Sequence, residues 1–130
     1  MSSSSFKQKF DSNEMSKRID NAGEQFWIDM PWEKGGKYLW DYIKKYNPTI
    51  LTDYNEISKI GKKKWIEQNI GKSQKVIFSH AKDKAKYSKK DSILIDNKLD
   101  TIYDWIAKGG IGIHYLNIDD IINKLKKIGL

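Results

Sequence analysis

The sequence of 130 residues is long enough for one compact domain, and its hydrophobic content of 38% is modest but sufficient for a single core. It contains no cysteine, which excludes a disulfide framework, thiolate metal ligands and a cysteine nucleophile. No apolar run approaches the roughly 18 residues that a membrane helix needs, and the serine-rich stretch 2–5 does not resemble a secretory signal. These features predict a protein of the cytoplasm, or of a host cytoplasm if the gene is viral, without a membrane partner.

Lysine carries almost all of the net charge of +7, because Arg18 is the only arginine. Seven lysines fall between Lys72 and Lys90, against one acid, Asp83. Such a run attracts phosphate or nucleic acid, but a solvated lysine-rich surface is the better explanation, since lysine lacks the bidentate geometry of arginine. Binding of nucleic acid is therefore the weakest of the functional hypotheses.

The first third of the chain gives few regular patterns. We expect residues 1–12 to be a loose lead-in and residues 13–23 to form a short polar helix. An aromatic segment follows at 26–32, where Pro31 argues against a regular helix or a central strand.

After that segment the pattern becomes regular. Apolar spacing predicts helices around 39–46, 56–69, 102–106 and 118–128, and short apolar runs predict strands at 49–52, 76–78, 93–95 and 111–114. In the second helix we expect Ile57, Ile60 and Trp65 to face inward. Asn117 is predicted to cap the last helix.

Strands that alternate with helices predict an α/β fold, with parallel strands, right-handed crossovers and helices on both faces. Ligands of such sheets bind at the carboxyl ends of the strands. The residue pairs at those ends are Thr52-Asp53, Ser79-His80, Asp96-Asn97 and His114-Tyr115.

The strongest chemical signal is the apolar run 93–95 followed by Asp96, Asn97 and, one helical turn later, Asp100. Oxygen ligands at this spacing suit a hard cation such as Mg²⁺. The alternative is that Asp96 or Asp100 caps the following helix, which is common where a strand leads into a helix.

Several ordered strings resemble the back half of haloacid-dehalogenase-like phosphatases, and most of all deoxyribonucleotidase-like proteins of the small phage type. The strings are Asn47-Pro48-Thr49-Ile50-Leu51-Thr52, Gly61-Lys62-Lys63-Lys64-Trp65-Ile66, Lys75-Val76-Ile77-Phe78, Lys86-Tyr87-Ser88, Ile93-Leu94-Ile95-Asp96 and Trp105-Ile106-Ala107-Lys108-Gly109-Gly110-Ile111-Gly112-Ile113. The resemblance implies a three-layer Rossmann-like core with a mostly parallel sheet, truncated at its amino-terminal end. It assigns residues 35–130 to that core and residues 1–34 to a flexible lead-in and the remnant of a small helical cap.

In that family an aspartate attacks the phosphate and a second aspartate, two residues later, is the general acid. The resemblance implies that Thr52 binds the phosphoryl group and that Lys86 steadies it, with Lys82 and Lys84 as alternatives. It also implies that Asp96, Asn97 and Asp100 help to hold Mg²⁺. A phosphoryl group needs oriented donors and positive charge of this kind.

Two departures from the family change the expected function. The chain contains no Asp-x-Asp element; Asp11, Asp20 and Asp29 lie in polar or aromatic contexts. Asn97 replaces the second acid of the metal pair. We therefore expect a truncated or split nucleotidase that is inactive alone, binds Mg²⁺ weakly or not at all, and needs a separate peptide carrying Asp-x-Asp.

Two alternatives accompany this interpretation. The first is a non-catalytic module that binds a nucleotide or another phosphomonoester, and the second is a basic nucleic-acid-binding protein. A sheet that lacked its central strand would expose strand edges, which also predicts self-association.

The aromatic residues Phe26, Trp27 and Trp32 precede the core at the place where the family has its cap. There they could stack on a nucleobase, worth about 1–3 kcal/mol per base, with Asp53 as a further substrate-binding residue. The alternative is that these rings only attach the cap to the core.

Overall fold

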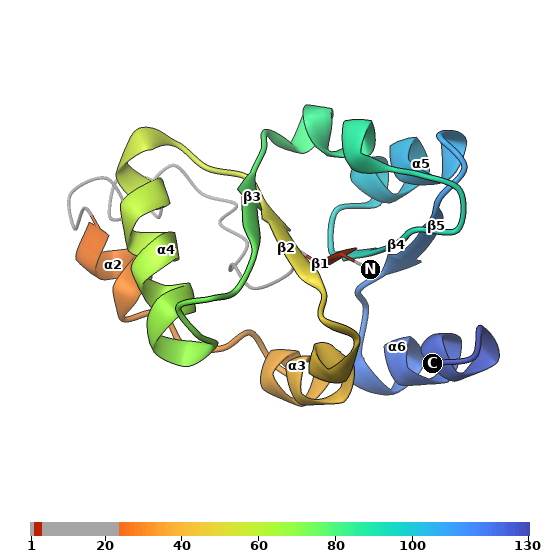
Figure 1. Ribbon diagram of the computed structural model, residues 1–130, viewed down its shortest axis with the longest axis horizontal. Helices are drawn as coiled ribbons and strands as arrows, with labels where there is room; N and C mark the ends of the chain where they lie inside the picture. The colour runs from red at the N-terminus through yellow and green to blue at the C-terminus, as the bar shows by residue number, and fades with distance from the viewer. Residues whose placement is uncertain (1, 4–23) are drawn as a thin grey trace.

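The computed structural model describes residues 2–3 and 24–130. Five parallel strands form one sheet in the order β3-β2-β1-β4-β5 (Figure 1). The strands are β1 (Ser2–Ser3), β2 (Thr49–Thr52), β3 (Val76–Phe78), β4 (Ile93–Asp96) and β5 (Ile111–His114). The four strands expected from the apolar runs are confirmed, and the sheet confirms the α/β class.

Helices cover both faces of this sheet. They are α2 (Glu24–Ile28), α3 (Gly36–Ile43), α4 (Glu56–Asn69), α5 (Leu99–Ala107) and α6 (Ile118–Lys127), with 3₁₀ helices η1 (Lys44–Tyr46) and η2 (Ala81–Tyr87). No helix in residues 24–130 combines the length and the apolar character needed to cross a membrane.

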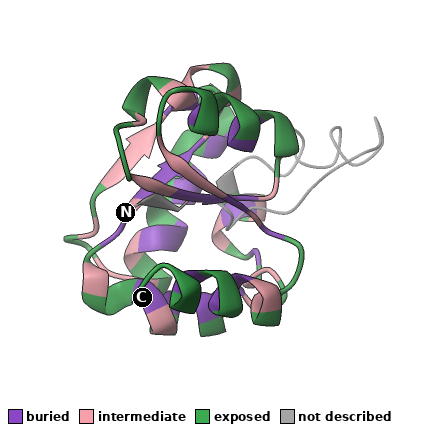
Figure 2. Ribbon diagram, turned by 90° about the vertical axis from the view of Figure 1, so that its right-hand side faces the viewer, coloured by how far each residue is buried: buried purple, intermediate pink, exposed green. Residues whose placement is uncertain are grey.

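Alternate strand positions supply the two cores, because successive side chains of a strand point to opposite faces. Leu51 and Leu94 pack with Trp105 of α5 on one face. Ile50 and Ile95 belong to the larger core on the other face, which also contains residues of α2, α3, α4 and α6. Figure 2 shows the buried residues concentrated on the strands and on the helix sides that face them.

Short polar side chains set the helix boundaries. Asn55 Oδ1 accepts a hydrogen bond from the Ser58 N–H at 2.8 Å, and Ser58 Oγ accepts one from the Asn55 N–H at 2.9 Å, so α4 begins with a capping box. Asn117 caps α6 as predicted, since its Oδ1 accepts from the Asp120 N–H at 2.9 Å. Asn47 has a φ of 53° and precedes Pro48, which ends the α3–η1 segment.

The inward face of α4 differs from the prediction. Ile57 and Ile60 are exposed, whereas Trp65 is buried as expected and its Nε1 donates to the Met30 carbonyl at 2.6 Å. Ile60 precedes Trp65 by five residues, which is about 140° around a helix, so the two cannot share one face. Packing of Trp65 beneath the segment that follows α2 decides which face turns inward.

The centre of the sheet also differs from the prediction. Ser2 and Ser3, which the sequence assigned to a loose lead-in, pair in parallel with both β2 and β4. The backbone of these two residues therefore occupies the position where a missing central strand and open edges were expected. The helix predicted at 13–23 lies outside the described residues.

Candidate functional site

Buried polar side chains lie at the carboxyl ends of the two strands that flank β1. Thr52 ends β2 and Asp96 ends β4, and both are buried. Because β1 lies between these strands, a strand spacing of about 4.8 Å puts their ends about 10 Å apart. Any ligand held by both must therefore sit over the carboxyl end of β1.

A buried ion pair closes β4. Lys84 Nζ lies 2.9 Å from Asp96 Oδ2, and the two side chains are only 5% and 4% exposed. Asp96 Oδ1 accepts a second hydrogen bond, from the Lys98 N–H, at 3.0 Å. Removing both charges from water is costly, so good geometry and these extra hydrogen bonds are needed to offset it.

The structure corrects the lysine assignment, because Lys84 and not Lys86 contacts Asp96. The Lys86 side chain is 75% exposed and pairs with Asp83 at 3.3 Å on the outside of η2. A 3₁₀ helix turns by about 120° per residue, so residues three apart lie on one side and residues two apart do not. Lys84 was one of the two alternatives left open by the sequence; the other, Lys82, is exposed.

A second buried lysine follows β2. Lys62 of α4 is 9% exposed in its side chain, and its Nζ donates to the Asp53 carbonyl at 2.6 Å and lies 3.4 Å from Asp53 Oδ1. Thr52 Oγ1 donates to the same carbonyl oxygen at 3.2 Å. The carboxyl end of β2 thus has its own lysine–carboxylate pair, Lys62 and Asp53, as the end of β4 has Lys84 and Asp96.

Sequence reasoning missed Lys62 because a lysine within a charged helix is normally solvated. A signal was present, since Lys62 precedes the buried Trp65 by three residues and therefore shares its helix face. The pattern could have identified Lys62, but not the carboxylate that it contacts.

The aromatic residues before the core are packing residues in the structure. Trp27 is 7% exposed, meets Phe26 edge-on at 5.4 Å between ring centroids, and lies beneath Lys62 Nζ at 4.7 Å. Trp32 meets Trp65 edge-on at 4.8 Å. The burial of Trp27 favours the packing alternative over stacking on a nucleobase, and Trp32 also packs against the core.

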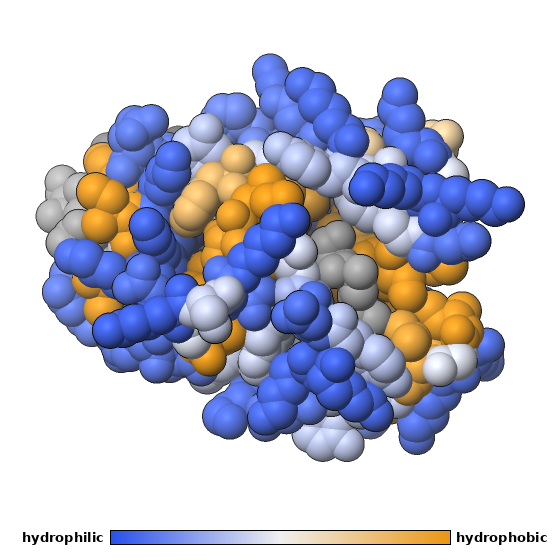
Figure 3. All heavy atoms as spheres, viewed as in Figure 1, coloured by the Kyte–Doolittle hydropathy of each residue, from blue (hydrophilic) through white to orange (hydrophobic). Residues whose placement is uncertain are grey.

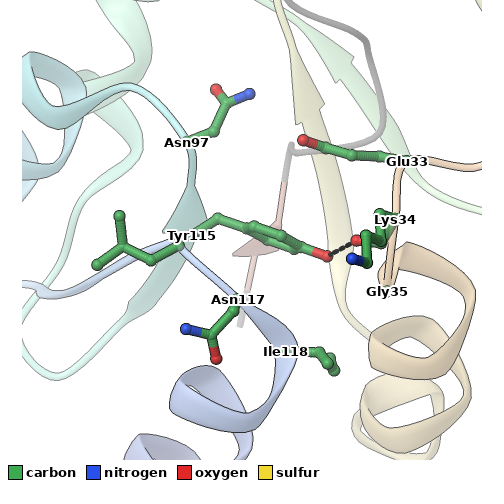
Figure 4. Close-up of a pocket in the computed structure, with 8 residues that line it drawn as sticks. Glu33, Lys34, Gly35, Asn97, Tyr115, Asn117 and Ile118 are labelled. Atoms are coloured by element: carbon green, nitrogen blue, oxygen red, sulfur yellow. Dashed lines mark hydrogen bonds between the residues drawn. The ribbon is translucent and has the colours of Figure 1, made fainter.

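A cavity of about 340 Å³ lies beside the β4 end of the site (Figure 4). It is lined by Glu33, Lys34, Gly35, Asn97, Tyr115, Leu116, Asn117 and Ile118. Tyr115 Oη donates to the Lys34 carbonyl at 2.7 Å, which ties the segment before α3 to the end of β5. Burial raises the pKa of Tyr115 above its ordinary value of 10.0, and the nearby Glu33 carboxylate raises it further.

A smaller cavity of about 160 Å³ lies at the β2 end. It is lined by Trp27, Asp53, Tyr54, Asn55, Ser58 and Lys62. The Tyr54 ring stacks on His80 at 5.0 Å between centroids, so aromatic rings also border the end of β3. The two cavities therefore lie on either side of the point where β1 ends.

The described residues fit Mg²⁺ poorly. Residues 2–3 and 24–130 contain no group of three or more His, Cys, Asp or Glu side chains placed to hold a metal. The oxygens of Asp96 already accept from Lys84 and from the Lys98 N–H, and Asp100 is exposed in the first turn of α5. Mg²⁺ is a hard cation that needs several anionic oxygens, and Asp96 alone supplies too few.

The face shown in Figure 3 has many hydrophilic side chains, with hydrophobic ones exposed between them. A third hollow, of about 230 Å³, lies along the open edge of β5 and is lined by Ile111, Gly112, Ile113, Lys124, Lys127 and Ile128. It contains no acid, hydroxyl or imidazole group, so its chemistry is limited to apolar contact and positive charge.

Comparison of the chain with protein-family models, with curated proteins and with solved structures found no match in any of the three.

Proposed function

We propose that this domain binds a phosphomonoester, of the nucleotide type, at the carboxyl edge of its sheet, and that it is a phosphatase-type domain of the haloacid-dehalogenase-like kind without its nucleophile. The observation that carries the proposal is the pair of buried lysines, Lys62 and Lys84, at the ends of the strands on either side of β1. Both lysines lie at the carboxyl edge of the sheet, where ligands of parallel sheets bind.

Placing ionised side chains inside a small domain costs free energy. A buried ion pair is a poor stabiliser, and an apolar pair of similar volume often serves a fold as well or better. A buried pair of Lys84 and Asp96, with a second buried lysine, Lys62, at the same edge of the sheet, is more easily understood as a binding site. Each ammonium group has three hydrogens, so a lysine that contacts a carboxylate still has hydrogens to donate to a phosphoryl oxygen.

The roles of the individual residues follow from their positions. Lys84 replaces Lys86 as the residue that steadies the phosphoryl group, and Thr52 contributes its hydroxyl from the end of β2. Lys62 adds charge on that side, with Asp53 holding it in place. Asp96 orients Lys84. The larger cavity, next to Asn97, is the space for the group that carries the phosphate.

Phosphoryl transfer also needs an attacking group, and the chain has no Asp-x-Asp element to supply one. We therefore propose binding as the activity of the chain alone, and hydrolysis only with a complementary segment that supplies the acids.

Inorganic phosphate and a nucleoside monophosphate, titrated into the protein and followed by NMR or calorimetry, test the binding proposal. We expect weak, salt-sensitive binding with little dependence on Mg²⁺. Thr52→Val, which keeps the side-chain shape, should weaken binding, whereas the control Lys86→Met should not. Loss in Lys86→Met with none in Thr52→Val would show that binding is only a response to net charge, and no loss in either would place the site elsewhere.

The catalytic part has its own test. The protein with Mg²⁺ should not hydrolyse p-nitrophenyl phosphate or a nucleoside monophosphate above background. Turnover that Thr52→Val or Lys84→Met abolishes would mean that a nucleophile exists in the chain and that the proposal misidentifies the chemistry.

A further inference from the structure

The outer strand β5 leaves one edge of the sheet open (Figure 1). In the part of the chain that the structure describes, β4 is the only strand that pairs with it. The N–H groups of Ile111 and Tyr115 donate to carbonyls on the β4 side, at 2.7 Å and 2.8 Å. Because the backbone groups of successive residues alternate in direction along a strand, the N–H and C=O groups of Gly112 and His114 point to the open edge.

The sequence of β5 has none of the features that normally protect such an edge. Natural edge strands are blocked by proline, by charged side chains or by a bulge. The four residues Ile111–His114 include no proline, lysine or acid, and they pair with β4 in unbroken register. An uncharged and regular edge of this kind can accept one more strand.

Apolar surface lies beside this edge on both faces of the sheet. On the α5 face, a Cβ at Gly112 would come within 2.8 Å of Ile102 and 3.0 Å of Ile106, so the glycine lets α5 lie close to the strand. Ile106 is 46% exposed there. On the α6 face lies the hollow of about 230 Å³, with Ile111 and Ile128 among its lining residues. A strand added to β5 would therefore bury apolar groups on both faces.

Lysine determines which strand fits this edge. Lys124 and Lys127 of α6 line the hollow, and no acidic side chain is among its lining residues. Lys124 contacts Asp120 at 2.9 Å and keeps hydrogens for another acceptor. A glutamate on the added strand would lay its methylene groups on the isoleucines of the hollow and its carboxylate beside these lysines. The same charges disfavour a second copy paired antiparallel through β5, because the lysines of both α6 helices would then meet on one face.

We propose that the open edge of β5 binds an extended segment of another protein in which apolar and acidic residues alternate. Its apolar side chains lie on the α5 face and its acidic side chains lie over Lys124 and Lys127. Main-chain hydrogen bonds to Gly112 and His114 provide affinity, and the alternation provides specificity. Binding here does not require the phosphate site, because Thr52 belongs to β2, on the far side of β1.

Peptide binding followed by NMR of the protein amides tests the proposal. The probe is the capped peptide Glu-Val-Glu-Val-Glu-Thr, and the control peptide has lysine in place of each glutamate. The probe should bind and slow the hydrogen exchange of the Gly112 and His114 N–H groups, whereas the Ile113 N–H, which faces β4, should exchange slowly throughout. The lysine peptide should do neither. Equal binding of the two peptides would overturn the proposal.

Charge-reversed variants of α6 test the role of the hollow. Lys127→Glu changes a lysine that lines it, and Lys126→Glu makes the same change in net charge one residue away, outside it. Lys127→Glu should weaken binding of the glutamate peptide by about fivefold or more and strengthen that of the lysine peptide. Lys126→Glu should change either affinity by less than about twofold, since an exposed charge outside the hollow is screened. Equal effects of the two substitutions would reduce binding to net charge and overturn the proposal.

Methylated peptides show whether the main chain pairs with β5. Only alternate N–H groups of an added strand face its neighbour. One probe is methylated on both valine nitrogens, and another on the nitrogens of the second and third glutamates. One of the two should lose binding and the other keep it, and the one that loses it reports the direction of the strand. Equal binding by the two, whether kept or lost, would refute strand addition.

The protein without peptide distinguishes a second copy from the proposed partner. We expect fast exchange of the Gly112 and His114 N–H groups and one sedimenting species over a wide range of protein concentration. Exchange that slows as the protein concentration rises would assign the edge to a second copy. Slow exchange at every concentration would show that the edge is already covered. Either result would overturn the proposal.

Discussion

Replacing Lys84 by methionine isolates the energetics of the candidate site. The substitution keeps the length of the side chain and removes its charge. Asp96, with a side chain that is 4% exposed, therefore loses its ion pair with Lys84 and keeps the hydrogen bond from the Lys98 N–H. Breaking a buried pair by removing one partner costs about 3–5 kcal/mol. That is a large part of the roughly 5–15 kcal/mol by which a domain of this kind is stable.

Urea denaturation followed by tryptophan fluorescence measures the loss, with Lys86→Met as the control. Lys86 pairs with Asp83 at the surface, and such pairs contribute about 0–1 kcal/mol. If Lys84→Met leaves too little folded protein to measure, Lys84→Met combined with Asp96→Asn supplies the comparison. That double variant removes both charges but keeps a carbonyl oxygen for the Lys98 N–H, and it should be more stable than Lys84→Met alone. Equal losses at Lys84 and Lys86 would refute the placement of Lys84 beside Asp96.

Three further substitutions test the surroundings of the site. Tyr115→Phe should lower the free energy of unfolding by about 1 kcal/mol, the usual value of one hydrogen bond, because it removes the contact with the Lys34 carbonyl. The pKa of Tyr115 is raised in the folded state, so the stability that the hydroxyl contributes is complete below its ordinary pKa of 10.0 and is lost as the pH rises through the folded pKa. The difference in stability between the natural protein and Tyr115→Phe, measured by urea denaturation, should therefore narrow at high pH. Gly110→Ala would place a Cβ 2.2 Å from Trp105 Nε1 and should lower stability by about 1–3 kcal/mol in the same assay. Asn117→Ala removes the cap of α6 and should cost about 1 kcal/mol, with Asn117→Asp close to the natural protein.

The sequence predicted much of the fold because its elements depend on local signals. The helix at 56–69 was predicted at the bounds that α4 has, since Asn55 begins it with a capping box and the pattern breaks near Gly71. The strand at 49–52 was equally well defined by its short apolar run after Pro48. Such features need no knowledge of distant parts of the chain.

The errors come from tertiary contacts that no local pattern contains. The direction in which η2 turns depends on its packing against α5 and the end of β4, so the choice between Lys84 and Lys86 could not be made from spacing alone. The inward face of α4 depends on Trp65 and Met30, 35 residues apart in the chain. Ser2 and Ser3 join the sheet through partners that are far away in sequence, and serine gives no strand signal.

Combining Lys84→Met with Asp96→Leu separates a structural role of the buried pair from a functional one. If the pair exists to hold η2 against β4, apolar side chains of similar size should weaken the fold. Buried ion pairs replaced in this way are instead often neutral or stabilising, by about 1–4 kcal/mol. We expect the double variant to unfold at a urea concentration equal to or above that of the natural protein, while losing the phosphate binding that the Lys86→Met control keeps. A double variant that is much less stable would show that the pair is needed by the fold, and the main argument for a phosphate site at the end of β1 would then be lost.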